Sequence, residues 1–103
     1  MQEITVTQLR EVLGSVNIID VRETSEYVTG HVPGALHMPL ATIPLRISEL
    51  DRDETLYVIC EAGGRSAQAC AYLSAQGFDA VNIGGGTGMW RTLGFEVNAG
   101  ERP

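Results

Sequence analysis

The chain has 103 residues, of which 44% are hydrophobic and 19% charged, proportions typical of one globular domain and not of a disordered or fibrous chain. Seven basic against thirteen acidic residues give a formal net charge of −6, and all seven basic residues are arginine, which excludes a GxxxxGK phosphate loop and Schiff-base chemistry. This negative balance, without a basic cluster, argues against nucleic acid and anionic membranes as partners.

The sequence also predicts a compartment. No apolar run approaches the ~18–20 residues of a membrane span, and the N-terminal MQEITV has neither the basic region nor the apolar region of a signal peptide. Two cysteines do not make a disulfide scaffold. We therefore expect residues 1–103 to form a single domain located in the cytoplasm.

The first part of the chain alternates short strand and helix patterns. A strand is expected at Ile4–Val6, followed by a helix that Thr7 caps and that ends near Gly14. The apolar run VNIID, residues 16–20, is typical of a buried parallel strand. The segment ETSEYVTG predicts a short helix that ends at Gly30.

The second part continues this alternation. A short strand is expected near Leu36–Met38, a helix around Leu45–Leu50, and the central strand of the sheet at Leu56–Cys60. Behind it follow a helix of small residues in SAQACAYLSAQG, a strand in AVNIGGG that runs into a glycine turn, and a short helix in GMWRTLG. Strands that alternate with helices predict an α/β fold of three layers, with a parallel sheet covered on both faces.

The segment LYVICEAGGRSAQACAYL carries the strongest indication of chemistry. Cys60 ends the central strand, and the glycine-rich loop from Glu61 to Arg65 leads into a helix that starts near Ser66. Ligand sites of open parallel sheets lie at this end of the strands. Successive N–H groups of such a loop and the first turn of the helix can point at one spot and form an anion nest.

A thiol in this position ionises easily. Comparable thiols at helix N-termini have pKa values that fall from about 8.5 to between roughly 3.5 and 7.5. Gly63 and Gly64 suit the loop because a tight curl needs a positive φ, which glycine adopts without strain. The plainer interpretation is that Cys60 merely ends a buried strand, since cysteine is often buried. The two glycines, Arg65 and the immediate start of a helix disfavour it.

Four motifs in this order resemble those of the rhodanese-homology family. They are the arm IDVRETSEYVTGHVPGALHMP, the loop VICEAGGRS, the helix segment Ala69–Phe78 and the turn GGGTGMW. The resemblance covers nearly the whole chain. It implies a five-stranded parallel sheet flanked by helices, and a cysteine that accepts sulfane sulfur as a persulfide before passing it to a nucleophile.

This resemblance implies roles for individual residues. Cys60 is the expected nucleophile. The expected substrate-binding residues are those of the loop: Glu61, Ala62, Gly63, Gly64, Arg65 and Ser66. Arg65 either faces the substrate anion or turns outward to tie the loop down. No metal or cofactor is implied. The expected donor is a small sulfur-containing anion or a persulfide, and the expected acceptor is cyanide or a thiol, a protein thiol included.

Residues outside the loop are expected to have supporting roles. Asp20 and Arg22 lie on the same side of a strand, a spacing that suits orienting the loop through an ion pair and hydrogen bonds. His31 and His37 lack partners at metal-ligand spacing and are expected to pack structurally. The resemblance makes Trp90 an anchoring core residue.

Two further expectations concern the surroundings of the loop. Cys70 shares a helix face with Ser66, Ala69 and Leu73, so it is expected to be a small core residue; a resolving role, closing a disulfide with Cys60, is the alternative. Family geometry places Met38 and the segment Ala41–Leu45 along one rim of the pocket.

The donor stays open at this point because of Glu61, where many family members carry a basic or neutral residue. A carboxylate about 6 Å from an incoming anion costs roughly 1–3 kcal/mol, which disfavours the thiosulfate dianion. Phosphatase relatives have one loop residue more than the four between Cys60 and Arg65, which argues against phosphate esters. A binding module that carries or senses sulfur without turnover is the rival function, and thiol–disulfide chemistry with Cys70 is the third.

Overall fold

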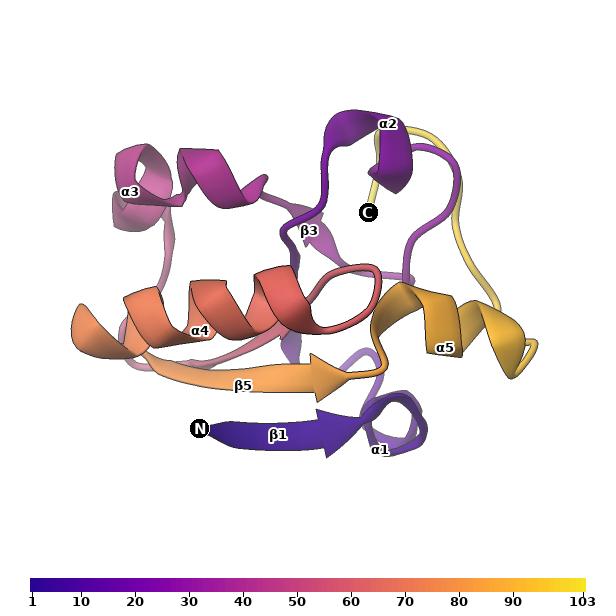
Figure 1. Cartoon of the computed structure of the whole chain (residues 1–103), viewed down its shortest axis with the longest axis horizontal. Coiled ribbons are helices and arrows are strands. Elements are labelled where there is room, and N and C mark those ends of the chain that lie inside the picture. The colour runs from indigo at the N-terminus through magenta and orange to yellow at the C-terminus, as the bar shows by residue number, and fades with distance from the viewer.

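The computed structural model describes residues 1–103 and contains one parallel sheet with helices on both faces (Figure 1). The strand order is β1-β5-β4-β2-β3, and every paired strand is parallel. The strands are β1 (Gln2–Thr5), β2 (Asn17–Asp20), β3 (Leu36–His37), β4 (Thr55–Ile59) and β5 (Asp79–Gly84). The α/β fold is confirmed, and β4 lies in the centre of the sheet as predicted.

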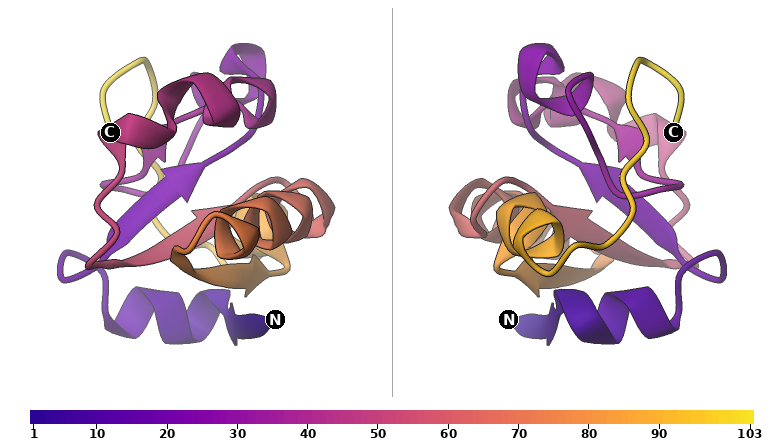
Figure 2. Two further views of the ribbon diagram at one scale, coloured as in Figure 1. Left: turned by 90° about the vertical axis from the view of Figure 1, so that its left-hand side faces the viewer. Right: turned by 90° about the vertical axis from the view of Figure 1, so that its right-hand side faces the viewer.

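The helices form the two outer layers. They are α1 (Val6–Glu11), α2 (Thr24–Tyr27), α3 (Ile43–Arg46), α4 (Gly64–Ala75) and α5 (Gly86–Thr92), with 3-10 turns at Leu40–Thr42 and Ile47–Glu49 on either side of α3. Figure 2 shows α1 and α4 on opposite sides of the sheet. None of these helices has both the length and the apolar character needed to cross a membrane.

Side chains that alternate along the strands feed two separate hydrophobic clusters. In β2, Ile18 belongs to the cluster under α1 and α5, and its neighbour Ile19 to the cluster under α3 and α4. In β4, Val58 and Ile59 divide in the same way. Because both faces of the sheet are covered, the inner strands β2 and β4 carry adjacent apolar residues, which is why they were recognisable in the sequence.

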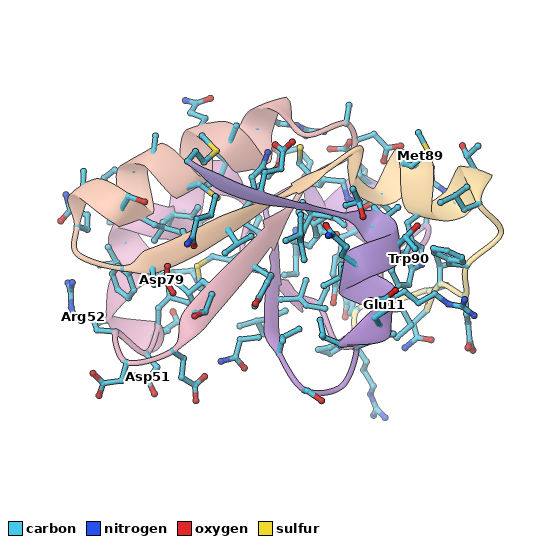
Figure 3. The ribbon with its side chains drawn as sticks, turned by 90° about the horizontal axis from the view of Figure 1, so that it is seen from below. Glu11, Asp51, Arg52, Asp79, Met89 and Trp90 are labelled. Atoms are coloured by element: carbon cyan, nitrogen blue, oxygen red, sulfur yellow. The ribbon has the colours of Figure 1, made fainter.

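Trp90 anchors the cluster under α1 and α5. Its side chain is 1% exposed, packs with residues of α1 and lies between α5 and α1 in the view from below (Figure 3). Its Nε1 donates a hydrogen bond to the carbonyl of Glu96 at 2.8 Å, which ties α5 to the C-terminal segment. That segment returns along the arm after α2, where His31 and Asn98 form an antiparallel bridge. The prediction of a core role for Trp90 is confirmed.

Two predicted boundaries were wrong. Thr5, not Thr7, caps α1, because Thr5 and Gln8 form a reciprocal capping box with hydrogen bonds of 3.1 and 2.9 Å. The strand therefore ends before Val6. The helix expected around Leu45–Leu50 begins at Ile43 instead, with Pro44 in its first turn, where a missing N–H leaves no hydrogen bond unmade.

The core under α4 yields a stability prediction. Replacing Leu73, which is fully buried there, with alanine should lower the free energy of unfolding by about 2–5 kcal/mol. The same change at Leu45, which is 87% exposed, should change it by less than about 0.5 kcal/mol. Urea unfolding of both variants checks this, and losses of equal size would contradict the described core.

Candidate active site

The loop after β4 folds around the thiol of Cys60. Cys60 directly follows β4, and α4 begins at Gly64, two residues before the predicted start at Ser66. The N-cap of α4 is Gly63, whose φ of 115° lies in the left-handed region. Of the two glycines expected to need a positive φ, only Gly63 does. Glycine is required at that position because other residues adopt this conformation only under strain.

The thiol of Cys60 accepts two hydrogen bonds inside the loop. The amide of Gly63 lies 3.0 Å from Sγ, and the hydroxyl of Ser66 lies 3.2 Å from it. Burial is the largest single influence on the thiol and opposes its ionisation. The hydroxyl and amide of Ser66, with the amides of Gly63 and Ala62, outweigh burial and lower the pKa of Cys60 below its ordinary value. Of the loop amides expected to face the thiol, those of Ala62, Gly63 and Ser66 therefore act on it.

The first turn of α5 holds the loop from behind. The amide of Thr87 donates to the carbonyl of Cys60 at 2.8 Å, and the amide of Gly88 donates to the carbonyl of Glu61 at 2.9 Å (Figure 1). A Cβ at Gly86 would lie only 2.5 Å from the Cys60 carbonyl oxygen. Carbonyls that point toward α5 leave the following loop amides free to face the thiol. From the sequence, only Trp90 of this turn was assigned a role, and the role of Gly86 and Thr87 was missed.

Asp20 and Arg22 form the ion pair that their spacing predicted. Both side chains are fully buried, and Nε and Nη2 of Arg22 bind the two carboxylate oxygens at 2.8–3.1 Å. Nη2 of Arg22 also donates to the carbonyl of Gly30 at 2.9 Å. Its Nη1 reaches Oε1 of Glu61 at 3.1 Å, so the pair is connected to the loop.

Glu61 is not a free carboxylate. Its second oxygen accepts a hydrogen bond from Nη1 of Arg91 at 3.0 Å, so it lies between two guanidinium groups. The hydrogen bond from Arg91, followed by the charges of both arginines, lowers the pKa of Glu61. The expected repulsion of an anion by Glu61 is therefore reduced, because both of its carboxylate oxygens are paired with arginines. Arg91 was missed because nothing in the sequence pairs α5 with this loop.

The guanidinium of Arg65 turns toward α2. It binds both carboxylate oxygens of Glu26, at 2.6 and 2.8 Å, in a forked ion pair. These hydrogen bonds from Arg65 lower the pKa of Glu26 to about 2, so Glu26 stays ionised well into the acid range. Of the two orientations left open for Arg65, the structure has the one that ties the loop to its neighbour. Glu26 stands in the DVRETSEY motif, but sequence reasoning gave it no role.

A cavity of about 420 Å³ opens beside the first turns of α4. Its walls are Glu23, Leu40, Ala41, Ile43, Pro44, Arg65, Gln68 and Tyr72. Of the rim expected from Ala41 to Leu45, the cavity walls contain Ala41, Ile43 and Pro44. Met38 was placed wrongly: it directly follows β3, is 0% exposed and belongs to the hydrophobic cluster under α4, because its amide donates to the carbonyl of Asp20 at 2.9 Å and holds this position against the sheet.

The remaining candidates are structural, as predicted. The ring nitrogens of His31 lie 2.9 Å from the carbonyl of Tyr27 and 2.7 Å from that of Arg102, and its ring stacks on Tyr27. His37 contacts the carbonyl of Arg22 through Nε2 at 2.8 Å. Cys70 is 1% exposed, and burial raises the pKa of its thiol to about 11. Both cysteines are free thiols.

Comparison with known proteins agrees with this geometry. The model of the family described as "Rhodanese-like domain" matches residues 5–93. The chain belongs to this family. A sulfurtransferase of Allochromatium vinosum is 40% identical over 87 residues, which cover 84% of this chain and 81% of that protein. A thiosulfate sulfurtransferase of Pseudomonas syringae is 38% identical over 76 residues, covering 73% and 72% respectively.

The rhodanese-like fold is also that of solved relatives. The crystal structure of a rhodanese-related protein from Thermoplasma volcanium superposes with a TM-score of 0.92 at 30% identity. The match covers 97% of this chain and 100% of that one. The five-stranded parallel sheet that the resemblance implied is thus confirmed.

The hydrogen bonds on Cys60 yield a titration prediction. Alkylation of Cys60 by iodoacetamide should set in at a lower pH than that of a free cysteine, because the lowered pKa supplies thiolate earlier. Removing the hydroxyl in Ser66→Ala should move this onset to higher pH. Cys70, with its raised pKa, should react slowly throughout. Peptide mass spectrometry follows the alkylation of each thiol. Equal rates for Cys60 and Cys70 would contradict the described hydrogen bonds to Cys60.

Proposed function

We propose that the protein is a sulfurtransferase that moves sulfane sulfur through a persulfide on Cys60. The observation that carries the proposal is the thiol itself, buried at the end of β4 with its pKa lowered by hydrogen bonds from Ser66 and the loop amides. A thiolate is the reactive form of cysteine. Membership of the rhodanese-like family and the sulfurtransferase names of its relatives support the same chemistry.

The reaction runs in two halves. In the first, the Cys60 thiolate attacks the sulfane sulfur of the donor: an Sγ–S bond forms, the bond between that sulfur and the rest of the donor breaks, and its electron pair leaves with the rest of the donor. In the second half, cyanide or a thiolate attacks the outer sulfur of the persulfide. The Sγ–S bond then breaks, and its electrons restore the Cys60 thiolate.

The loop supplies the substrate contacts in this proposal. Backbone amides of the segment 61–66 surround the outer sulfur of the persulfide and stabilise its single negative charge. Because Cys60 is already poised to ionise, the attack needs no general base. Four residues between Cys60 and Arg65 make a cradle suited to one sulfur rather than to a tetrahedral phosphate ester. Asp20 and Arg22 support the loop through Glu61.

The reaction needs neither a metal nor a cofactor, and we place it in the cytoplasm, where thiols such as Cys60 and Cys70 stay reduced. The donor is a small sulfur-containing anion or a persulfide, and the acceptor is cyanide or a thiol, including one carried by a protein. All the chemistry lies within the single domain that residues 1–103 form.

A second candidate is a sulfur-carrying or sensing module without turnover. The observation that favours it is the burial of Cys60, which is 1% exposed, because a covered persulfide would be protected from acceptors in solution. Such a module would take up sulfur once and release it only to a docked partner. The two candidates differ in whether the chain turns over with a free acceptor.

Intact mass and turnover test both candidates. After exposure to polysulfide, the chain should gain one sulfur atom on the Cys60 peptide, and cyanide should then release thiocyanate over many cycles. Cys60→Ser should lose at least about a thousandfold of the rate, the equivalent of about 4 kcal/mol in transition-state stabilisation, while its melting temperature stays similar.

Cys70→Ser is the matched control, since it removes the other buried thiol. It should keep most of the activity. A persulfide that forms but releases no more than one equivalent of thiocyanate would favour the carrier. Loss of activity in both serine variants, with both still folded, would instead indicate disulfide chemistry between the two cysteines.

A further inference from the structure

Each arginine that contacts the loop, or belongs to it, is already paired with a carboxylate. Arg22 binds Asp20 and Glu61, and Arg91 binds the other oxygen of Glu61. Arg65, at the end of the loop, is held by both oxygens of Glu26. The groups that donate to Cys60 Sγ are the Gly63 amide and the Ser66 hydroxyl, and no arginine of the loop is free of a carboxylate.

Three further arginines have partners outside the loop. Arg46 pairs with Glu49, and Arg10 and Arg52 lie over aromatic rings of Phe95 and Phe78. A cradle of amides is suited to one negative charge, such as that of a thiolate or a persulfide anion. Thiosulfate brings two more negative charges to the thiolate, so three must be accommodated at once. A hydropersulfide, RSSH, reacts with only the single charge of the thiolate.

The cavity beside the loop has walls that fit an organic group. Leu40, Ala41, Ile43 and Pro44 line one side, and Tyr72 of α4 lines it as well. Its charged members are Glu23 and Arg65, and Arg65 is neutralised by Glu26. Arg65 belongs both to the cavity wall and to the loop that begins at Cys60, so the cavity adjoins the end of that loop.

We propose that the donor of this protein is a hydropersulfide with an apolar organic group, bound in the cavity lined by Leu40, Ala41, Ile43, Pro44 and Tyr72, and that thiosulfate is a poor donor. This rests on the proposed function. The Cys60 thiolate attacks the outer sulfur of RSSH, the Sγ–S bond forms, and the S–S bond of the donor breaks. The electron pair leaves on the thiolate RS⁻, and the proton stays with the transferred sulfur or passes to water.

A comparison of two donors tests the proposal. The second-order rate constant of Cys60 persulfidation should be at least about tenfold higher for butyl hydropersulfide than for thiosulfate at low ionic strength. Stopped-flow mixing with mass detection of the Cys60 persulfide measures both rates on the unmodified chain. Equal rates, or a faster reaction with thiosulfate, would overturn the proposal.

Unmasking one arginine tests the electrostatic part. Glu26→Gln leaves Arg65 without its neutralising charge, so the rate with thiosulfate should rise about tenfold, while that with butyl hydropersulfide should change by less than about twofold. Glu49→Gln is the matched control, since it removes an exposed carboxylate from Arg46, whose contacts lie outside the loop. An equal rise of the thiosulfate rate in Glu26→Gln and Glu49→Gln would contradict charge compensation at Arg65. An equal rise with thiosulfate and with butyl hydropersulfide in Glu26→Gln would contradict it as well.

The length of the organic group tests the cavity. From methyl to butyl hydropersulfide, the rate should rise about threefold per added methylene as each is buried. Ala41→Asp puts a charge into the exposed part of the cavity wall and should abolish this dependence. Ala71→Asp, at an exposed alanine of α4 outside the cavity, should preserve it. A dependence on chain length that survives Ala41→Asp would overturn the assignment of the cavity.

The proposed function and this inference fail in different ways. If no donor leaves an extra sulfur on Cys60, the sulfurtransferase proposal itself is wrong. If Cys60 is persulfidated, but thiosulfate reacts as fast as butyl hydropersulfide and chain length has no effect, the function stands and only the donor class is wrong.

Discussion

The site depends on two backbone hydrogen bonds between elements far apart in the sequence. The first turn of α5 donates amides from Thr87 and Gly88 to the carbonyls of Cys60 and Glu61. A peptide whose carbonyl points toward α5 directs its own N–H the opposite way, into the curl of the loop. The second of these peptides carries the amide of Ala62, one of the groups that lower the pKa of Cys60, and glycine is needed at position 86 because a Cβ there would meet both carbonyls.

Ion pairs secure the same loop from its other sides. The buried pair of Asp20 and Arg22 reaches it through Glu61, and Glu26 holds Arg65 at its end. Removing one partner of a buried pair is costly because the other charge loses its compensation. The arginines stabilise the loop through these ion pairs, and their guanidinium groups are therefore not free to bind a substrate anion. The donor of low charge that we propose rests on this pairing of the arginines and on the apolar residues of the cavity beside Arg65.

Most of the fold and the centre of the site were predictable because they rest on local patterns. The apolar run of β4, the cysteine at its end and the glycines behind it stand next to one another in the chain. The side chains that form ion pairs with the loop were not predictable from local patterns. Glu26 and Arg65 are separated by 39 positions, and Glu61 and Arg91 by 30, so that only the tertiary arrangement brings their charges together. The misplaced cap of α1 has another cause, since two threonines compete for it and Gln8 favours Thr5.

A thiolate titration tests the dependence of the site on α5 most directly. In a Cys70→Ser background, the ultraviolet absorbance of the Cys60 thiolate is followed against pH in Gly86→Ala and Gly94→Ala. Both glycines have positive φ, of 60° and 77°, but only a Cβ at Gly86 meets the loop carbonyls, while that at Gly94 meets nothing within 4 Å. The account predicts a raised Cys60 pKa in Gly86→Ala alone, with both variants folded by circular dichroism. An unchanged pKa in folded Gly86→Ala would contradict it.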